Sequence, residues 1–390
     1  MIGLLLAIIY LAFISLGLPD SLLGSAWPSM YPEFDVPVSF AGIVSMIISA
    51  GTIISSIESD RVTRKLGTGK VTAISVALTA VSLFGFSITK SFPLLCIWAL
   101  PYGLGAGSVD AALNNYVALH YKSKHMSWLH CMWGIGATVG PYIMGYALSG
   151  GYGWSAGYRI IGILQVCLSA ILFFSLPLWK RKDDRISDSE QKNDTGHPLS
   201  LRQVVKIPGA KAVMLCFFCY CALESTVILW SSSYLHLYKG IGADAAASYA
   251  GLFLLGVTLG RAASGFLTMK LNDKQMIRLG QILILSGIIL LMLPIAKPVS
   301  LVGLFVIGLG CAPIYPCIIH STPDHFGREN SQAVIGIQMA SAYVGSCFMP
   351  PVFGLIANHI TVALMPPYIL LILALMIVMH EILIKRTKKS

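Results

Sequence analysis

Charged residues are scarce in this sequence, and their scarcity excludes most soluble architectures. Only 11% of the 390 residues are Asp, Glu, Lys or Arg, whereas 56% are hydrophobic. A soluble domain carries about 25% charged residues. The segments of alternating polarity that a membrane β-barrel needs are missing as well. The composition therefore predicts an all-α integral membrane protein.

The residue sets that carry catalysis or bind metals are also missing. Three of the nine cysteines, Cys216, Cys219 and Cys221, lie close together, but no Cys or His pair with zinc spacing follows them. No nucleophile–base pair emerges. The glycines Gly103, Gly105 and Gly107 lack the preceding strand of a dinucleotide-binding turn. We therefore expect no enzyme activity, no metal and no cofactor.

Long apolar runs dominate what is present. A helix of about 20 residues crosses a hydrocarbon core of roughly 30 Å. The first run has no basic segment before it, so it is expected to stay as a helix and not to be a cleaved signal. The runs predict twelve transmembrane helices, near residues 3–28, 38–58, 70–89, 93–119, 127–149, 157–179, 209–236, 245–269, 275–296, 299–320, 330–357 and 361–384.

The distribution of basic residues sets the expected orientation. With both termini in the cytoplasm, 22 of the 27 Lys and Arg residues fall on the inner side. This asymmetry is the one that the positive-inside rule describes. The net charge of +10 follows from that topology, so it does not indicate a nucleic-acid partner.

The chain divides into two similar halves. Residues 183–208 form the one long polar stretch, which predicts a cytoplasmic linker between six-helix bundles at 1–182 and 209–390. Gly103-Leu104-Gly105 recurs as Gly308-Leu309-Gly310, and Ser39-Phe40-Ala41-Gly42 recurs as Ser248-Tyr249-Ala250-Gly251. Two repeated halves of this kind are typical of secondary transporters.

Isolated ionisable residues inside the apolar runs are the candidate functional groups. A charge in lipid is costly and usually faces a cavity. A carboxylic acid in such a setting favours its neutral form, so it can take up a proton on one side of a membrane and release it on the other. Asp20, Asp110 and Glu224 are placed in this way, and Arg261 is expected to pair with a helix carboxylate or carbonyl.

Several motifs resemble those of the major facilitator superfamily. Asp60-Arg61-x-x-Arg64-Lys65 is similar to its signature between the second and third helices. Within the superfamily the chain looks most like the fucose permease (sugar:proton symporter) family. That resemblance rests on Asp20, Gly105-x-Gly107-x-x-Asp110-x-x-x-Asn114, Trp128-x-His130-x-x-Trp133-Gly134-x-Gly136, Glu224, Gly260-Arg261-x-x-x-Gly265 and Tyr315-Pro316.

The resemblance implies the major facilitator fold and specific roles for these residues. Carboxylates of the first and fourth helices serve proton coupling and sugar binding in that family, which points to Asp20 and Asp110 here. Amides, carboxylates and aromatic faces suit sugar hydroxyls and ring faces. The candidate substrate-binding residues are Asn114, Asn115, His130, Trp133, Glu224, Trp230, Tyr315 and Gln338. The candidate gating residues are Asp60, Arg61, Arg64 and Arg261.

The expected function is proton-coupled uptake of a monosaccharide or a similar small polar solute. Sodium coupling stays open. The alternative is a drug or metabolite:proton antiporter, because Gly136-x-x-x-Gly140-Pro141-x-x-x-Gly145 resembles an antiporter signature, although Met144 replaces one of its glycines. A sensor with a transporter fold is a third interpretation. We expect a monomeric, multi-pass protein of the plasma membrane, bacterial in origin, with the lipid bilayer and the solute as its partners.

Overall fold

The computed structural model describes residues 2–120, 123–183, 201–268, 270–294 and 297–387. Side chains of some further residues inside these ranges are not described. Every regular element in the described ranges is a helix. The chain divides into two compact units, residues 1–193 with 240–251, and residues 194–239 with 252–390.

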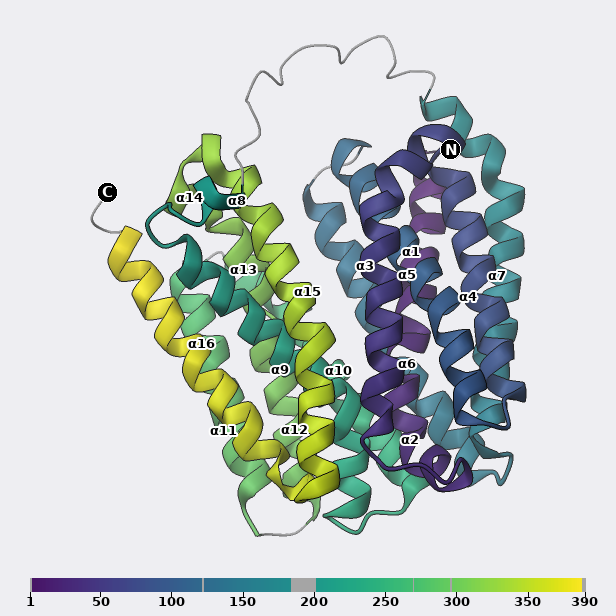
Figure 1. Ribbon diagram of the computed structural model, residues 1–390. Coiled ribbons are helices and arrows are strands. Elements are labelled where there is room, and N and C mark those ends of the chain that lie inside the picture. The colour runs from purple at the N-terminus through teal and green to yellow at the C-terminus, as the bar shows by residue number, and fades with distance from the viewer. Residues whose placement is uncertain (1, 121–122, 184–200, 269, 295–296, 388–390) are drawn as a thin grey trace. The chain divides into compact units, whose positions relative to one another are not determined.

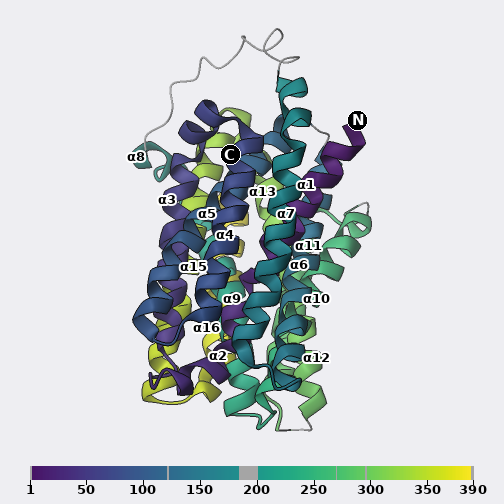
Figure 2. The same ribbon diagram turned by 90° about the vertical axis from the view of Figure 1, so that its right-hand side faces the viewer.

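The first unit is a bundle of long helices that run side by side (Figures 1 and 2). Helix α1 packs on α6, α3 packs on α5, and α4 packs on both α5 and α7. The N-terminal residues of α10 (Ala243–Leu267) also belong to this unit. Its helices are α1 (Ile2–Asp20), α2 (Leu22–Glu33), α3 (Phe40–Leu66), α4 (Thr68–Ile88), α5 (Phe92–His120), α6 (Ser123–Ser149) and α7 (Gly153–Asp183).

The second unit contains long helices together with several short ones. Helix α9 packs on α15 and α16, and α11 packs on α12. Its elements are α8 (Leu201–Val204), α9 (Ala210–Leu237), α10 (Ala243–Leu267), α11 (Asp273–Met292), α12 (Lys297–Cys311), α13 (Ile314–His320), α14 (Thr322–Phe326), α15 (Arg328–His359), the 3₁₀ turn η1 (Val362–Leu364) and α16 (Met365–Thr387).

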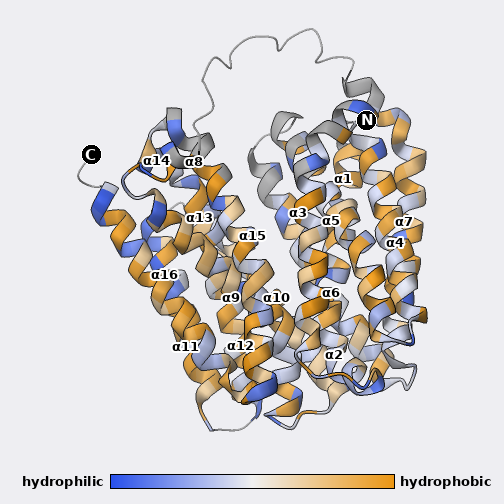
Figure 3. Cartoon of the chain, in the orientation of Figure 1, coloured by the Kyte–Doolittle hydropathy of each residue, from blue (hydrophilic) through white to orange (hydrophobic). Residues whose placement is uncertain are grey.

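Ten segments in the described ranges are long and apolar enough to cross a membrane. The two remaining predicted spans, 38–58 and 127–149, fall on α3 and α6, which are each 27 residues long. In α3 the described apolar segment is Phe40–Ser56. Hydrophilic residues gather at helix ends and loops, while the helix middles are hydrophobic (Figure 3).

The first span differs from its prediction. Residues 3–28 are predicted as one helix, but the structure breaks the helix at Ser21 and continues it as α2 to Glu33. The whole span then runs from Leu4 to Glu33. Ser21 has φ −104° and ψ 0°, outside the helical range. As a result, Asp20 lies near the middle of its span and not near its outer end.

The predicted tenth span, 299–320, is also divided. Helix α12 ends at Cys311 and α13 begins at Ile314. Pro313 and Pro316 lie at this break, and proline removes a helical hydrogen bond. Of the predicted linker 183–208, the structure describes Asp183 at the end of α7 and residues 201–208, which include α8; the remainder lies outside the described residues.

Candidate functional site

Asp20 is the last residue of α1, and two other helices hydrogen-bond its carboxylate. Trp133 of α6 donates its indole N–H to Oδ2 at 2.7 Å. Tyr102 of α5 donates its hydroxyl to Oδ1 at 3.2 Å. The Asp20 side chain is nevertheless exposed, although it lies in an apolar span. It is therefore an accessible carboxylate with one donor on each oxygen.

Close packing of α1 against α6 brings Trp133 to Asp20. A Cβ atom at Gly17 would collide with the backbone carbonyl of Trp133, and one at Gly136 would collide with that of Ile14. Gly140 likewise lies against the carbonyl of Leu18. Small residues allow membrane helices to approach this closely. We call Gly17, Gly136 and Gly140 the glycine seam.

Asp110 forms a second polar group on α5. Asn114 donates its side-chain amide to Asp110 Oδ1 at 2.8 Å and to the Asp110 backbone carbonyl at 3.0 Å. Both side chains are half-buried. Asp110 follows Tyr102 by eight residues, which is about 12 Å along a helix axis. The side chain of Asn115 lies outside the described residues.

His130 lies one turn before Trp133 on α6. Its ring meets the ring of Phe13 edge to face, with 5.9 Å between the centroids. The side chain is half-buried. The structure therefore places His130 on the α1-facing side of α6, as it does Trp133.

In the second unit, Glu224 of α9 and Arg261 of α10 form a partly buried ion pair. The Arg261 Nη2 and Glu224 Oε1 atoms are 3.8 Å apart, and each side chain is 15% exposed. Tyr220, one turn earlier on α9, donates its hydroxyl to the same Glu224 oxygen at 2.9 Å. Because the pair is largely removed from water, loss of either partner would leave a costly charge.

The remaining candidates of the second unit separate into two groups. The Tyr315 ring lies 6.1 Å from that of Tyr220, so it belongs to the surroundings of Glu224. Trp230 is fully buried and donates its indole N–H to the Pro350 carbonyl at 2.9 Å. Gln338 is also fully buried and donates to Thr322 Oγ1 at 3.2 Å. Trp230 and Gln338 pack inside the unit, and their solute-binding role stays a prediction.

The proposed gating side chains Asp60, Arg61 and Arg64 lie outside the described residues. Their backbone belongs to the last turns of α3, which ends before Gly67 at φ +80°. Their gating role and that of Arg261 stay predictions.

Sequence reasoning missed two residues of these sites. Tyr220 could have been found, because it precedes Glu224 by four positions and so shares its helix face. Tyr102 gave no such signal, since its partner Asp20 lies on another helix. Within the described ranges no three His, Cys, Asp or Glu residues are grouped as a metal site would require. Cys216, Cys219 and Cys221 are free and buried.

Comparison with known proteins gives matches along the whole chain. A glucose/mannose transporter of Bacillus subtilis, GlcP, is 21% identical over 390 residues, covering 97% of this chain and 94% of that protein. The uncharacterized transporter y4wD of Sinorhizobium fredii is 24% identical over 358 residues, with 88% and 90% covered. A cis,cis-muconate transport protein of Acinetobacter baylyi is 24% identical over 189 residues, which is 47% of this chain and 45% of that protein.

The fold and the family follow from two further matches. The crystal structure of a bacterial homolog of the human lysosomal transporter Spinster, inward-facing and unoccupied, superposes with a TM-score of 0.73 at 12% identity. It covers 99% of this chain and 97% of that one. The sequence profile of the Major Facilitator Superfamily matches residues 9–350 and 213–389. The chain is an all-α membrane protein with the major facilitator fold, and it belongs to the Major Facilitator Superfamily.

Proposed function

We propose that this transporter takes up a monosaccharide or a similar small polar solute together with a proton, by alternating access. The observation that carries the proposal is the Asp20 carboxylate, exposed at the middle of an apolar span and bonded by Trp133 and Tyr102. The likeness to a glucose/mannose transporter supports the class of solute. The proton is proposed as the coupling ion because the motifs around Asp20 and Asp110 resemble those of the sugar:proton symporter family.

The chemistry of the Asp20 carboxyl group suits both proton coupling and solute binding. An ionised carboxylate accepts hydrogen bonds on both oxygens, whereas the protonated form turns one oxygen into a donor. Protonation therefore changes what Asp20 offers to Trp133, to Tyr102 and to a sugar hydroxyl. A solute that binds better to one protonation state of Asp20 changes the proton affinity of Asp20, and protonation changes the solute affinity by the same factor. That reciprocity is the requirement for symport.

The antiporter alternative rests on the glycines of α6. In this chain Gly136 and Gly140 allow α1 to pack closely against α6, because a larger side chain at either position would collide with the backbone of α1. The motif therefore does not need an antiport role to explain it. The polar side chains Asn114 and Asp110 also suit a polar solute better than a lipophilic drug.

The test is uptake into proteoliposomes of glucose, mannose, fucose and muconate, driven by an inward proton gradient or an inward sodium gradient. We expect accumulation of one of the sugars with the proton gradient alone. Asp20→Asn and Asp110→Asn should abolish accumulation but leave exchange of labelled for unlabelled solute partly intact. Accumulation that persists in both single variants would overturn the coupling role. Proton-driven export of amphipathic cations, with none of the four solutes accumulated, would establish the antiporter instead.

A further inference from the structure

Asp20 follows a proline, and that proline leaves a backbone carbonyl of α1 without its helical donor. In a helix, the N–H of residue 19 would bond to the carbonyl of residue 15. Pro19 has no N–H, so the Ser15 carbonyl loses this bond. Inside a membrane an unsatisfied backbone group costs several kcal/mol. Some other donor must therefore reach Ser15.

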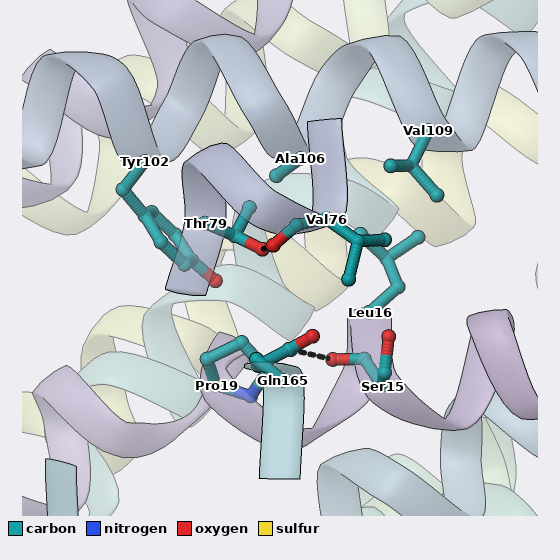
Figure 4. Close-up of a pocket in the computed structure, with 9 residues that line it drawn as sticks. All are labelled: Ser15, Leu16, Pro19, Val76, Thr79, Tyr102, Ala106, Val109 and Gln165. Atoms are coloured by element: carbon teal, nitrogen blue, oxygen red, sulfur yellow. Dashed lines mark hydrogen bonds between the residues drawn. The ribbon is translucent and has the colours of Figure 1, made fainter. Parts of the chain in front are cut away.

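Gln165 of α7 is that donor. Its side-chain Nε2 donates to the Ser15 carbonyl at 2.5 Å, and the residue is only 1% exposed. Figure 4 shows Gln165 beside Pro19 with its amide directed to Ser15. A buried glutamine from a neighbouring helix thus replaces the hydrogen bond that Pro19 removes.

The same device occurs on the other side of Asp20. Pro141 of α6 removes the donor for the Ala137 carbonyl, four residues earlier. Ser21, the residue after Asp20, donates its hydroxyl to this carbonyl at 3.0 Å. Asp20 therefore lies between two side-chain hydrogen bonds, each of which replaces a backbone hydrogen bond that a proline removes. One of them is to a carbonyl of α1 and the other is to a carbonyl of α6.

We propose that Gln165 is a positioning residue of the Asp20 site: its bond to the Ser15 carbonyl holds the end of α1 in place and so keeps the Asp20 carboxylate against Trp133 and Tyr102. Its importance for transport rests on the proposed function of Asp20. The positioning itself does not, because it concerns the geometry of α1 alone.

The surroundings of Gln165 favour a specific task over simple packing. Its neighbours in the bundle are mostly apolar: it lines a cavity of about 10 Å³ with Leu16, Val76, Ala106 and others. No described residue bonds to its Oε1 atom. A cavity of this volume holds one water molecule. An apolar side chain would fill the same space without leaving an oxygen to satisfy, so the amide is explained by its bond to Ser15.

A double-mutant cycle with Pro19 tests this assignment. Gln165→Met keeps the length of the side chain but removes the N–H donor, and Pro19→Ala restores the backbone N–H. We expect Gln165→Met alone to lower the melting temperature of the detergent-solubilised protein by about 2–4 °C. In the Pro19→Ala background, the same substitution should have almost no further effect.

A spectroscopic measurement separates positioning from stability. The emission spectrum of each protein minus that of its Trp133→Phe counterpart isolates the indole that bonds to Asp20. Gln165→Met should shift the maximum of this difference spectrum when Pro19 is present and leave it in place in the Pro19→Ala background. Gln281→Met is the matched control, because Gln281 of α11 is 4% exposed and no described residue bonds to its Nε2.

The outcomes are distinct. Equal losses of melting temperature with and without Pro19 would overturn the assignment, as would an unshifted Trp133 spectrum. Neither measurement needs a solute or a gradient. Intact gradient-driven uptake by Asp20→Asn would therefore overturn the proposed function while leaving the result of this cycle readable.

Discussion

Trp133 donates its indole N–H to Asp20 at 2.7 Å, across 113 positions of sequence. This bond joins the end of α1 to the middle of α6 and defines the polar centre of the first unit. The hydrogen bond from the second donor, the Tyr102 hydroxyl, is longer, at 3.2 Å. The two bonds lead to different expectations for their removal.

Trp133→Phe should weaken solute affinity more than Tyr102→Phe. A hydrogen bond to a charged group contributes about 1.5–3 kcal/mol, and 1.4 kcal/mol corresponds to about a tenfold change. We expect a loss of about 10- to 100-fold for Trp133→Phe and a smaller loss for the longer Tyr102 bond. Calorimetry with the solute identified by the uptake assay measures both. Equal or reversed losses would contradict this ranking.

Glu224→Gln should weaken solute affinity and also lower stability, because Arg261 would lose its carboxylate. Breaking a buried ion pair by removing one partner costs about 3–5 kcal/mol. The double variant Glu224→Gln with Arg261→Gln should recover much of the melting temperature, since neither charge then remains.

The affinity of the double variant decides what Glu224 does. If stability returns and affinity does not, Glu224 or Arg261 contacts the solute. If both return together, the pair serves the scaffold only, and the solute site must be formed by helices of the first unit.

Gly17→Ala should disrupt the packing of α1 on α6. A methyl group at this position collides with the Trp133 carbonyl, and overpacking costs about 1–3 kcal/mol. Gly265→Ala is the matched control, because an added Cβ there meets nothing within 4 Å. We expect a reduced yield of folded protein and a lower melting temperature for Gly17→Ala only. A stable Gly17→Ala protein with an unchanged Trp133 spectrum would show that the seam is looser than the geometry indicates.

His325 should make stability depend on pH at one helix end. Burial lowers the pKa of His325, although Asp324 and Asp273 partly oppose this, and its Nδ1 lies 2.8 Å from Thr387 Oγ1. A lowered pKa means that the folded state favours neutral histidine. Its contribution is therefore complete above the unfolded pKa of about 6.5 and is lost as pH falls below it.

The measurement is the melting temperature at pH 7.5 and pH 5.5. His325→Gln should reduce the difference between the two values, whereas His359→Gln, at an exposed histidine, should not. An unchanged difference for His325→Gln would place the pH-sensitive group elsewhere.

The sequence predicted the helical class and most spans because apolar runs of membrane length leave few alternatives. The predicted first span was too short because α2 continues through Pro28 and Pro32, which usually end helices. Asp20, Asp110 and Glu224 were recognisable because each is an acid in an apolar run.

Partners from distant helices could not be predicted in the same way. In the sequence, Tyr102 and Gln165 are single polar residues in apolar helices, and nothing near them indicates a partner. Only the fold brings them beside Asp20 and Ser15. Conversely, Trp230 and Gln338 have side chains suited to a solute, yet both are fully buried. A hydrophobic period of 3.6 residues identifies the buried face of an amphipathic helix. These helices are apolar on every side, so the sequence pattern does not predict which face of a helix lines a cavity.

The glycine seam has a consequence for motion. Backbones packed this closely cannot slide along each other, because the next larger side chain would meet a carbonyl oxygen. Helices α1 and α6 must then travel as one rigid body through any cycle of transport. Asp20 and its indole partner keep a constant separation in that motion, so a change in Trp133 fluorescence during turnover would report the chemical state of the carboxyl group and not the movement of helices. The protein thus carries its own optical probe beside Asp20.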